Sequence, residues 1–89
     1  MTSHTHKNFW KLYEKLSKNV KIQAKKQYLI FDNDPYHASL HFKCVHLTKP
    51  IYSARITKDY RAVGVLTDDI IVWFWIGNHK EYDKLLKKK

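Results

Sequence analysis

The amino-acid sequence is short and strongly basic. It has 89 residues, and 17 Lys and Arg against 8 Asp and Glu give a formal net charge of +9. Because domains usually have roughly 100–150 residues, this length predicts one domain over residues 1–89 and excludes a two-domain enzyme. The charge indicates a polyanionic partner such as nucleic acid, although lysines that only improve solubility would give the same balance.

Neither export nor membrane insertion is expected. One cysteine cannot form an internal disulfide and no apolar run begins the chain, so the predicted location is the cytoplasm. The longest apolar stretch, Ile70 to Ile76, is far shorter than the roughly 18–20 residues that cross a bilayer. The two glycines lie outside any Gly-rich loop, which excludes P-loop and Rossmann nucleotide binding.

The first third of the chain predicts an αα-hairpin. Apolar residues follow a helical period from Asn8 to Asp34. Ser17-Lys18-Asn19 separates two apolar groups and supplies capping residues, so the two helices are expected to meet there. The second helix is expected to end at Asp32-Asn33-Asp34-Pro35, because the residue before a proline is disfavoured in the α conformation.

Short segments rich in β-branched and aromatic residues follow and predict an antiparallel meander. They are Phe42 to Leu47, Ile51 to Thr57, Tyr60 to Leu66 and Ile70 to Ile76. Asn78 then offers a helix N-cap, with Glu81 three residues later, so a last helix is expected. The predicted fold class is α+β: an N-terminal αα-hairpin, a four-stranded antiparallel twisted sheet and a C-terminal helix.

Strand register predicts which side chains share a face, because a slip of one residue moves every side chain to the opposite face. Turns of odd length around Lys58 and Asp68 keep charged residues apart from apolar ones. The pairs expected across these turns are Ile56 with Tyr60, Ala54 with Ala62, Arg55 with Arg61, Trp75 with Arg61, and Trp73 with Val63. The expected outer face of the sheet carries Arg55, Arg61, Trp73 and Trp75.

His79 is the candidate for acid–base chemistry. It lies in the first turn of the predicted last helix, where the helix dipole favours a neutral imidazole and free N–H groups favour a bound phosphate. Tyr82 follows three residues later on nearly the same side, and Trp75 and Gly77 bring the sheet edge to the same place. The alternatives are a surface or capping histidine for His79 and a core aromatic for Tyr82.

Arg55 and Arg61 are the candidate phosphate ligands, because a planar guanidinium can hold a phosphate through two hydrogen bonds. Lys43 and Lys58 would add charge at the rim of this face. The alternative for the arginines is surface ion pairing with Asp59, Asp68 or Asp69.

No metal or cofactor is expected. His4 and His6 lie near the terminus, and His37 and His41 lie in a loop without helical spacing. Cys44, within a predicted strand, is expected to be a small buried hydrophobic residue.

The sequence from Tyr52 onward resembles a known family. Residues 52–65 read YSARITKDYRAVGV, and residues 70–86 read IIVWFWIGNHKEYDKLL. These strings are similar to the RelE/ParE superfamily of bacterial type II toxin–antitoxin toxins, in particular to RelE-like members that end in WIGxHxxYDxL. The segments DPYHASLHFK and FWKLY match the same members, so the resemblance extends over nearly the whole chain.

The resemblance implies a sheet flanked by helices and, for RelE-like members, cleavage of messenger RNA in the ribosomal decoding site. It implies that Arg61 contacts phosphate, with Arg55 as a second basic residue, and that the segment with His79 and Tyr82 supplies catalytic groups. Many relatives begin with a strand. Ser3 to Lys7 is short and polar, so no first strand is expected here.

The predicted function is that of a type II toxin, a ribosome-dependent and metal-independent mRNA endoribonuclease that inhibits translation. Its expected partners are a cognate antitoxin, the ribosome and mRNA. The predicted catalytic residues are Arg61, His79, Tyr82 and Arg55, and the predicted RNA-binding residues are Lys43, Lys58 and Trp75. Two alternatives remain open, a ParE-like inhibitor of DNA gyrase without nuclease chemistry and a non-catalytic RNA-binding module.

Overall fold

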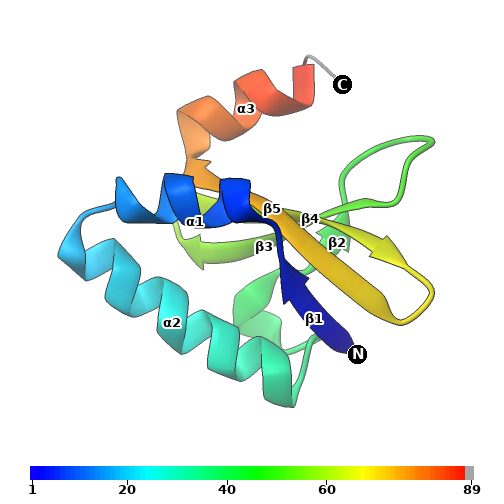
Figure 1. Cartoon of the computed structure of the whole chain (residues 1–89). Helices are drawn as coiled ribbons and strands as arrows, with labels where there is room; N and C mark the ends of the chain where they lie inside the picture. Colours follow the sequence, from blue (N-terminus) through cyan, green and yellow to red (C-terminus); the bar gives the residue numbers. More distant parts are fainter. Residues whose placement is uncertain (88–89) are drawn as a thin grey trace.

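The computed structural model of the chain describes residues 1–87 and shows a mixed sheet with helices on both faces (Figure 1). The elements are β1 (Thr2–Thr5), α1 (Lys7–Glu14), α2 (Lys18–Asn33), the 3₁₀ turn η1 (Ala38–Leu40), β2 (Lys43–Cys44), β3 (Ile51–Thr57), β4 (Tyr60–Thr67), β5 (Ile70–Asn78) and α3 (His79–Lys87). Within these residues the strand order is β1-β5-β4-β3-β2. The α+β class is confirmed, whereas the prediction of four strands, all antiparallel, is wrong.

The helical hairpin forms where local sequence signals placed it. The Ser17 hydroxyl accepts a hydrogen bond from the Val20 amide at 3.3 Å and caps α2, so the predicted break between the helices is confirmed. The amide of Asp34, the residue before the proline, donates to the Ile30 carbonyl at 2.7 Å and closes the other end of α2.

A first strand is present, and the expectation that it would be missing is wrong. β1 runs parallel to β5, and the Thr2 amide donates to the Asp69 carbonyl while the His6 amide donates to the Trp73 carbonyl, both at 2.8 Å. The Ser3 hydroxyl also accepts a hydrogen bond from the Trp73 indole at 3.0 Å. This strand is held by backbone hydrogen bonds to the edge of β5. Its polar sequence has no alternation of apolar residues from which a strand could have been predicted.

β2 is only two residues long, shorter than the predicted strand from Phe42 to Leu47. After Cys44 the chain turns, because the His46 imidazole accepts hydrogen bonds from the amides of Thr48 and Lys49 at 3.1 and 3.0 Å. Cys44 is exposed rather than buried, and its thiol donates to the His46 carbonyl at 3.4 Å. The expectation of a buried cysteine is therefore wrong, since the edge strand ends at this residue.

The register of β3 against β4 is largely as predicted. Ala54 lies opposite Ala62 and Arg55 lies opposite Arg61, which confirms the two central pairs. Tyr60 pairs with Thr57 instead of Ile56, because a bulge in β3 leaves one residue without a partner before the turn.

The register of β4 against β5 differs from the prediction by two positions. Asp68, with φ of 57°, and Asp69 form a two-residue turn, and Thr67 therefore pairs with Ile70. Arg61 consequently lies opposite Gly77 instead of Trp75. The turn assumed from sequence between β4 and β5 was one residue too long. In addition, β5 contains one residue that has no partner on β4.

That extra residue is at Phe74 and separates Trp73 from Trp75. Val63 pairs with Trp75 and Gly64 pairs with Trp73, so Phe74 has no partner on β4. A bulge of this kind shifts the alternation, and the two indoles lie on opposite faces of the sheet. Trp73 is 4% exposed and packs with the helical hairpin, so placing it on the outer face was wrong.

Two apolar clusters hold the layers together. The larger one joins α1 and α2 to one face of the sheet and includes Phe31, Ala54 and Trp73. The smaller one joins α3 to the opposite face and includes Val63 and Tyr82. We call this second face the α3 face.

Candidate functional site

Basic side chains from three strands meet on the α3 face. Residues directly opposite one another in an antiparallel pair point to the same side of a sheet. Lys43 lies opposite Ser53, and Arg55, two residues after Ser53, lies opposite Arg61. Ser53 reaches Tyr82 of α3, which fixes the side to which this whole group belongs. We call Lys43, Arg55 and Arg61 the basic face, with Lys58 exposed in the β3–β4 turn beside it.

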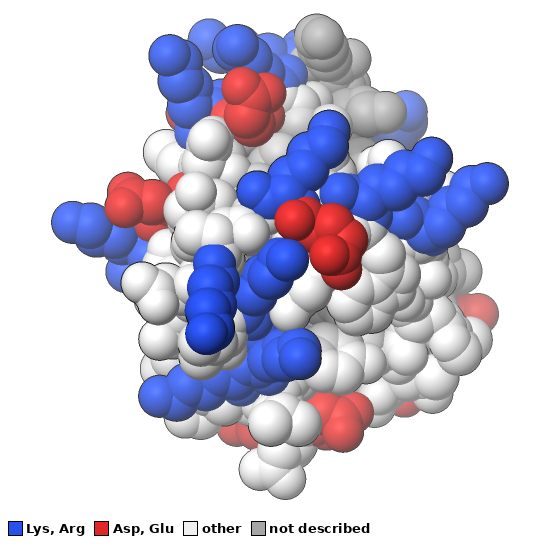
Figure 2. Space-filling view, turned by 60° about the vertical axis from the view of Figure 1, so that its left-hand side comes forward, with Lys and Arg blue, Asp and Glu red and all other residues white. Residues whose placement is uncertain are grey.

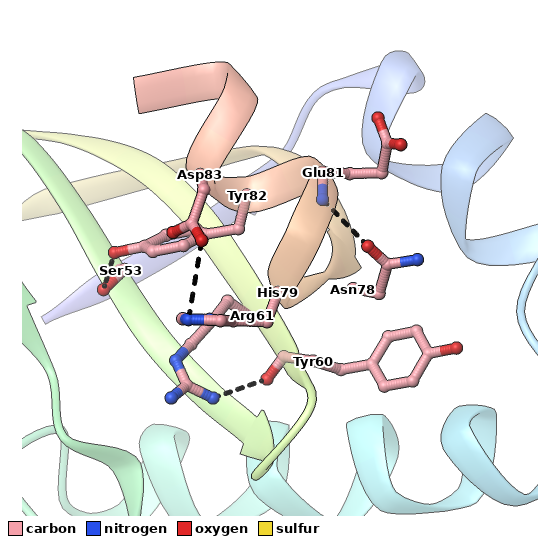
Figure 3. A network of polar contacts seen from close by, with 8 residues as sticks. All are labelled: Ser53, Tyr60, Arg61, Asn78, His79, Glu81, Tyr82 and Asp83. Atoms are coloured by element: carbon pink, nitrogen blue, oxygen red, sulfur yellow. Dashed lines mark hydrogen bonds and ion pairs between the residues drawn. The ribbon is translucent and has the colours of Figure 1, made fainter. Parts of the chain in front are cut away.

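The side chain of Arg61 is held in place at one end of its guanidinium group. Its Nη1 donates to the carbonyl oxygen of Tyr60 at 3.1 Å (Figure 3) and to that of Thr57 at 2.8 Å. Because a guanidinium has five N–H donors, others remain available for a bound anion. Arg61 is half-buried, so its charge is less screened than that of a fully exposed side chain.

The arginines are not neutralised by nearby carboxylates. None of the ion pairs found in residues 1–87 includes Arg55 or Arg61. Asp69, one of the alternative partners, instead lies 3.4 Å from the N-terminal ammonium group of Met1. The alternative of surface ion pairs with Asp59, Asp68 or Asp69 is therefore not found in this part of the chain.

The start of α3 is closed by internal hydrogen bonds. The Asn78 side chain accepts from the Glu81 amide at 2.8 Å, which confirms Asn78 as the N-cap (Figure 3). The His79 amide donates to the Asp59 carbonyl at 2.6 Å. Two of the first amides of the helix thus already have acceptors, so fewer amides are free for a phosphate than the sequence analysis expected.

His79 itself is exposed at the base of α3. Its Nε2 lies 3.7 Å from the Asp83 carboxylate, one helical turn later. Its ring stacks on Tyr82 with centroids 5.7 Å apart and an interplanar angle of 21°. The imidazole therefore has one nitrogen near a carboxylate and a face supported by an aromatic ring, while remaining accessible to a substrate.

Tyr82 lies underneath His79 in the smaller core. It is 8% exposed, and its hydroxyl donates to the Ser53 hydroxyl at 3.2 Å (Figure 3). The ring also packs against Trp75, with centroids 6.3 Å apart. This geometry matches the alternative in which Tyr82 is a core aromatic residue. It favours a role in which the Tyr82 ring supports the His79 imidazole over one in which the Tyr82 hydroxyl contacts a substrate.

Three residues of the site were not identified from sequence: Ser53, Thr57 and Asp83. Strand alternation could have found Ser53, because it lies two residues before Arg55. The i, i+4 spacing from His79 could have found Asp83. Thr57 acts through its backbone carbonyl, so no side-chain pattern indicates it.

An apolar groove lies on the other side of the sheet from the basic face, between β1, α1 and α2. This groove has a volume of about 530 Å³. Its lining is largely apolar and includes Phe9, Trp10, Tyr28 and Leu29, with His4 and Lys25 among the polar residues. Leu29 is 68% exposed, so the groove has an apolar side chain that this chain leaves uncovered.

Basic side chains gather on one face of the molecule (Figure 2). Figure 2 shows Lys and Arg side chains over one face, with a few acidic groups among them. No group of three or more His, Cys, Asp or Glu side chains in residues 1–87 is arranged to hold a metal ion. In the same residues no helix is both long and apolar enough to span a bilayer.

A model of the ParE-like toxin domain matches residues 18–84. The chain belongs to the ParE-like toxin family. This assignment confirms the resemblance to the RelE/ParE superfamily that the C-terminal motif indicated. No curated protein sequence matches the ParE-like chain significantly.

Solved structures show the same fold at low sequence identity. A chain of the RelB–RelE antitoxin–toxin complex from Methanococcus jannaschii is 16% identical, with a TM-score of 0.75 over 92% of this chain and 96% of that one. YafQ from E. coli strain BL21(DE3) is 18% identical, with a TM-score of 0.72 over 90% and 94%. The isolated E. coli RelE toxin is 17% identical, with a TM-score of 0.64 over 98% and 96%.

Proposed function

We propose that this ParE-like domain is the toxin of a type II toxin–antitoxin module and that it cleaves messenger RNA on the ribosome without a metal ion. The observation that carries the proposal is the pair of arginines on the α3 face, which have no carboxylate partner within residues 1–87. Arg61 lies opposite Gly77, two residues before the exposed His79. An open, basic surface with one acid–base group is suited to binding and cleaving an RNA backbone.

The reaction needs charge stabilisation and proton transfer. The 2′-oxygen of a nucleotide attacks the adjacent phosphorus, a 2′,3′-cyclic phosphate forms, and the bond to the 5′-oxygen breaks. In the proposed mechanism, Arg61 donates its remaining N–H groups to the non-bridging oxygens as negative charge develops there. His79 exchanges a proton with the attacking or the leaving oxygen, a contribution typically of about 10²–10⁴ in rate.

The other predicted site residues take supporting roles. Arg55 lies beside Arg61 on β3 and would hold a neighbouring phosphate, and exposed Lys43 and Lys58 would attract the RNA backbone. Trp75 is half-buried and offers part of its ring for stacking of a base. Tyr82, with its buried hydroxyl, would hold the imidazole of His79 in position.

A cognate antitoxin is the proposed protein partner. The groove between β1, α1 and α2 presents apolar side chains beside Lys25, on a chain with a net charge of +9. A partner segment with apolar side chains and flanking carboxylates would complement both the apolar lining of this groove and its positive charge. The same antitoxin would have to reach or distort the α3 face in order to stop cleavage.

Inhibition of DNA gyrase is the second candidate. The family model that matches is the ParE-like one, and the Tyr82 hydroxyl is buried, which leaves fewer groups for proton transfer. A gyrase inhibitor would use the same fold without cleaving RNA.

The two candidates are separated by their products. Purified protein is incubated with ribosomes and a defined message, and the new 5′ ends are mapped, with free message as the control. A parallel reaction measures gyrase-dependent cleavage of supercoiled DNA. Message cut in the presence of ribosomes supports the proposal, whereas intact message together with trapped gyrase cleavage complexes contradicts it and supports the second candidate.

A further inference from the structure

The β3–β4 turn is bonded to both chemically important parts of the site. Lys58 and Asp59 form the turn between β3 and β4. On one side, Arg61 donates to the Thr57 carbonyl at 2.8 Å. On the other side, the Asp59 carbonyl accepts a hydrogen bond from the His79 amide at 2.6 Å. The turn therefore connects the Arg61 guanidinium to the base of the helix that carries His79.

The side chain of Thr57 sets the shape of this turn. Its hydroxyl accepts a hydrogen bond from the Asp59 amide at 3.1 Å. Such a bond between a threonine hydroxyl and the amide two residues later fixes the intervening backbone. A single hydroxyl thus orients two carbonyl groups, that of Thr57 toward Arg61 and that of Asp59 toward His79.

We propose that Thr57 is a positioning residue that aligns Arg61 and His79 through the β3–β4 turn. This inference rests on the proposed RNA cleavage and adds to it a residue that itself has no contact with the substrate. Loss of the hydroxyl releases the Asp59 amide and lets the turn rotate. The guanidinium group and the imidazole then no longer keep a fixed separation, which lowers the rate of the chemical step more than the binding of RNA.

Thr57→Val tests this role, because valine keeps the branched shape and removes the hydrogen bond. Ribosome-dependent cleavage by Thr57→Val should show a kcat about tenfold lower with little change in KM. Thr57→Ser keeps a hydroxyl and should restore most of the rate. The matched control is Thr67→Val, the same substitution at the exposed end of β4, beside the other hairpin turn. This control should cleave as the unmodified protein does.

A double-mutant cycle distinguishes positioning from a general loss of structure. Because Thr57 acts partly through Arg61, Thr57→Val should lower the rate by clearly less than about tenfold when Arg61 is already alanine, since only the alignment of His79 is then left to lose. Full additivity of the two losses would overturn the proposal, and so would a Thr57→Val variant that cleaves at the unmodified rate.

Two measurements do not depend on cleavage. Hydrogen exchange at the His79 amide and the NMR signals of the Arg61 guanidinium report the two bonds of the turn directly. In Thr57→Val the amide should exchange faster and the guanidinium should rotate faster, with both unchanged in Thr67→Val. If the protein cuts no message, these signals still decide whether Thr57 aligns the two groups, so failure of the proposed function is distinguishable from failure of this inference.

Discussion

Arg61 and Gly77 face each other across β4 and β5, and an aromatic ring occupies the place of the missing side chain. A Cβ atom at Gly77 would lie 2.7 Å from Cζ2 of Trp75. The indole therefore lies over Gly77, directly across the sheet from the arginine that we place at the centre of the site. This strand position needs a glycine because any side chain would displace the ring.

Gly77→Ala should consequently destabilise the protein. Forcing a methyl group against a packed ring costs typically about 1–3 kcal/mol. Urea unfolding followed by tryptophan fluorescence measures the change. In a Trp75→Leu background the same substitution should cost much less, since the ring that it meets has gone. Equal costs in both backgrounds would show that the indole is not the obstacle.

Arg61→Ala should leave the protein folded and lower ribosome-dependent cleavage about 10²–10³-fold, because it removes a donor to the developing charge. Arg55→Ala should have a smaller effect. Lys49→Ala, an exposed change in the β2–β3 loop, controls for the loss of one positive charge. Initial rates of message cleavage measure the effect, and circular dichroism shows whether each variant is folded. A soluble Arg61→Ala variant with full activity would contradict the phosphate-binding role.

Tyr82→Phe tests whether the buried hydroxyl is structural. The bond between Tyr82 and Ser53 is inside the smaller core, where Ser53 is 2% exposed. Its loss should cost about 0.5–1.5 kcal/mol of unfolding free energy, and Ser53→Ala should cost a similar amount. The double variant should be little worse than either single one. Cleavage that falls far more than stability in Tyr82→Phe alone would return Tyr82 to a direct catalytic role.

Leu29→Asp should weaken neutralisation by the antitoxin without changing cleavage by the toxin alone. The substitution places a carboxylate in the apolar groove on a side chain that is 68% exposed, so folding should be preserved. Ile22→Asp is the matched control, because Ile22 is on the same helix and 53% exposed but does not line the groove. Titration of each toxin with antitoxin, read by message cleavage, measures the effect. Equal titration curves would show that the antitoxin docks elsewhere.

Local chemistry made part of the fold predictable. Ser17 and Asn78 cap their helices through short-range hydrogen bonds, which is why sequence alone located both helix starts. Arg55 and Arg61 were paired correctly because a wrong register would have put charge into the core.

The errors came from interactions between distant parts of the chain. β1 depends on backbone bonds to β5, and no side-chain pattern encodes them. The shorter turn at Asp68 and Asp69 set the face of Trp73, and the single extra residue at Phe74 then put Trp75 on the opposite face. One unpaired residue in a strand has no clear sequence signature. At the site, the helical spacing that grouped His79 with Tyr82 was right, but it does not reveal that one is exposed and the other buried.

The parallel pairing of β1 with β5 also sets an order of events during synthesis. Residues Thr2–Thr5 are made long before Ile70–Trp73, the residues with which they pair. Contacts between residues so far apart in sequence form late, since the intervening chain must be ordered first. A nascent chain therefore cannot pair β1 with β5 until the residues of β5 have been made. The ribosome that makes this protein thus holds an unfinished sheet until β5 has been made and released.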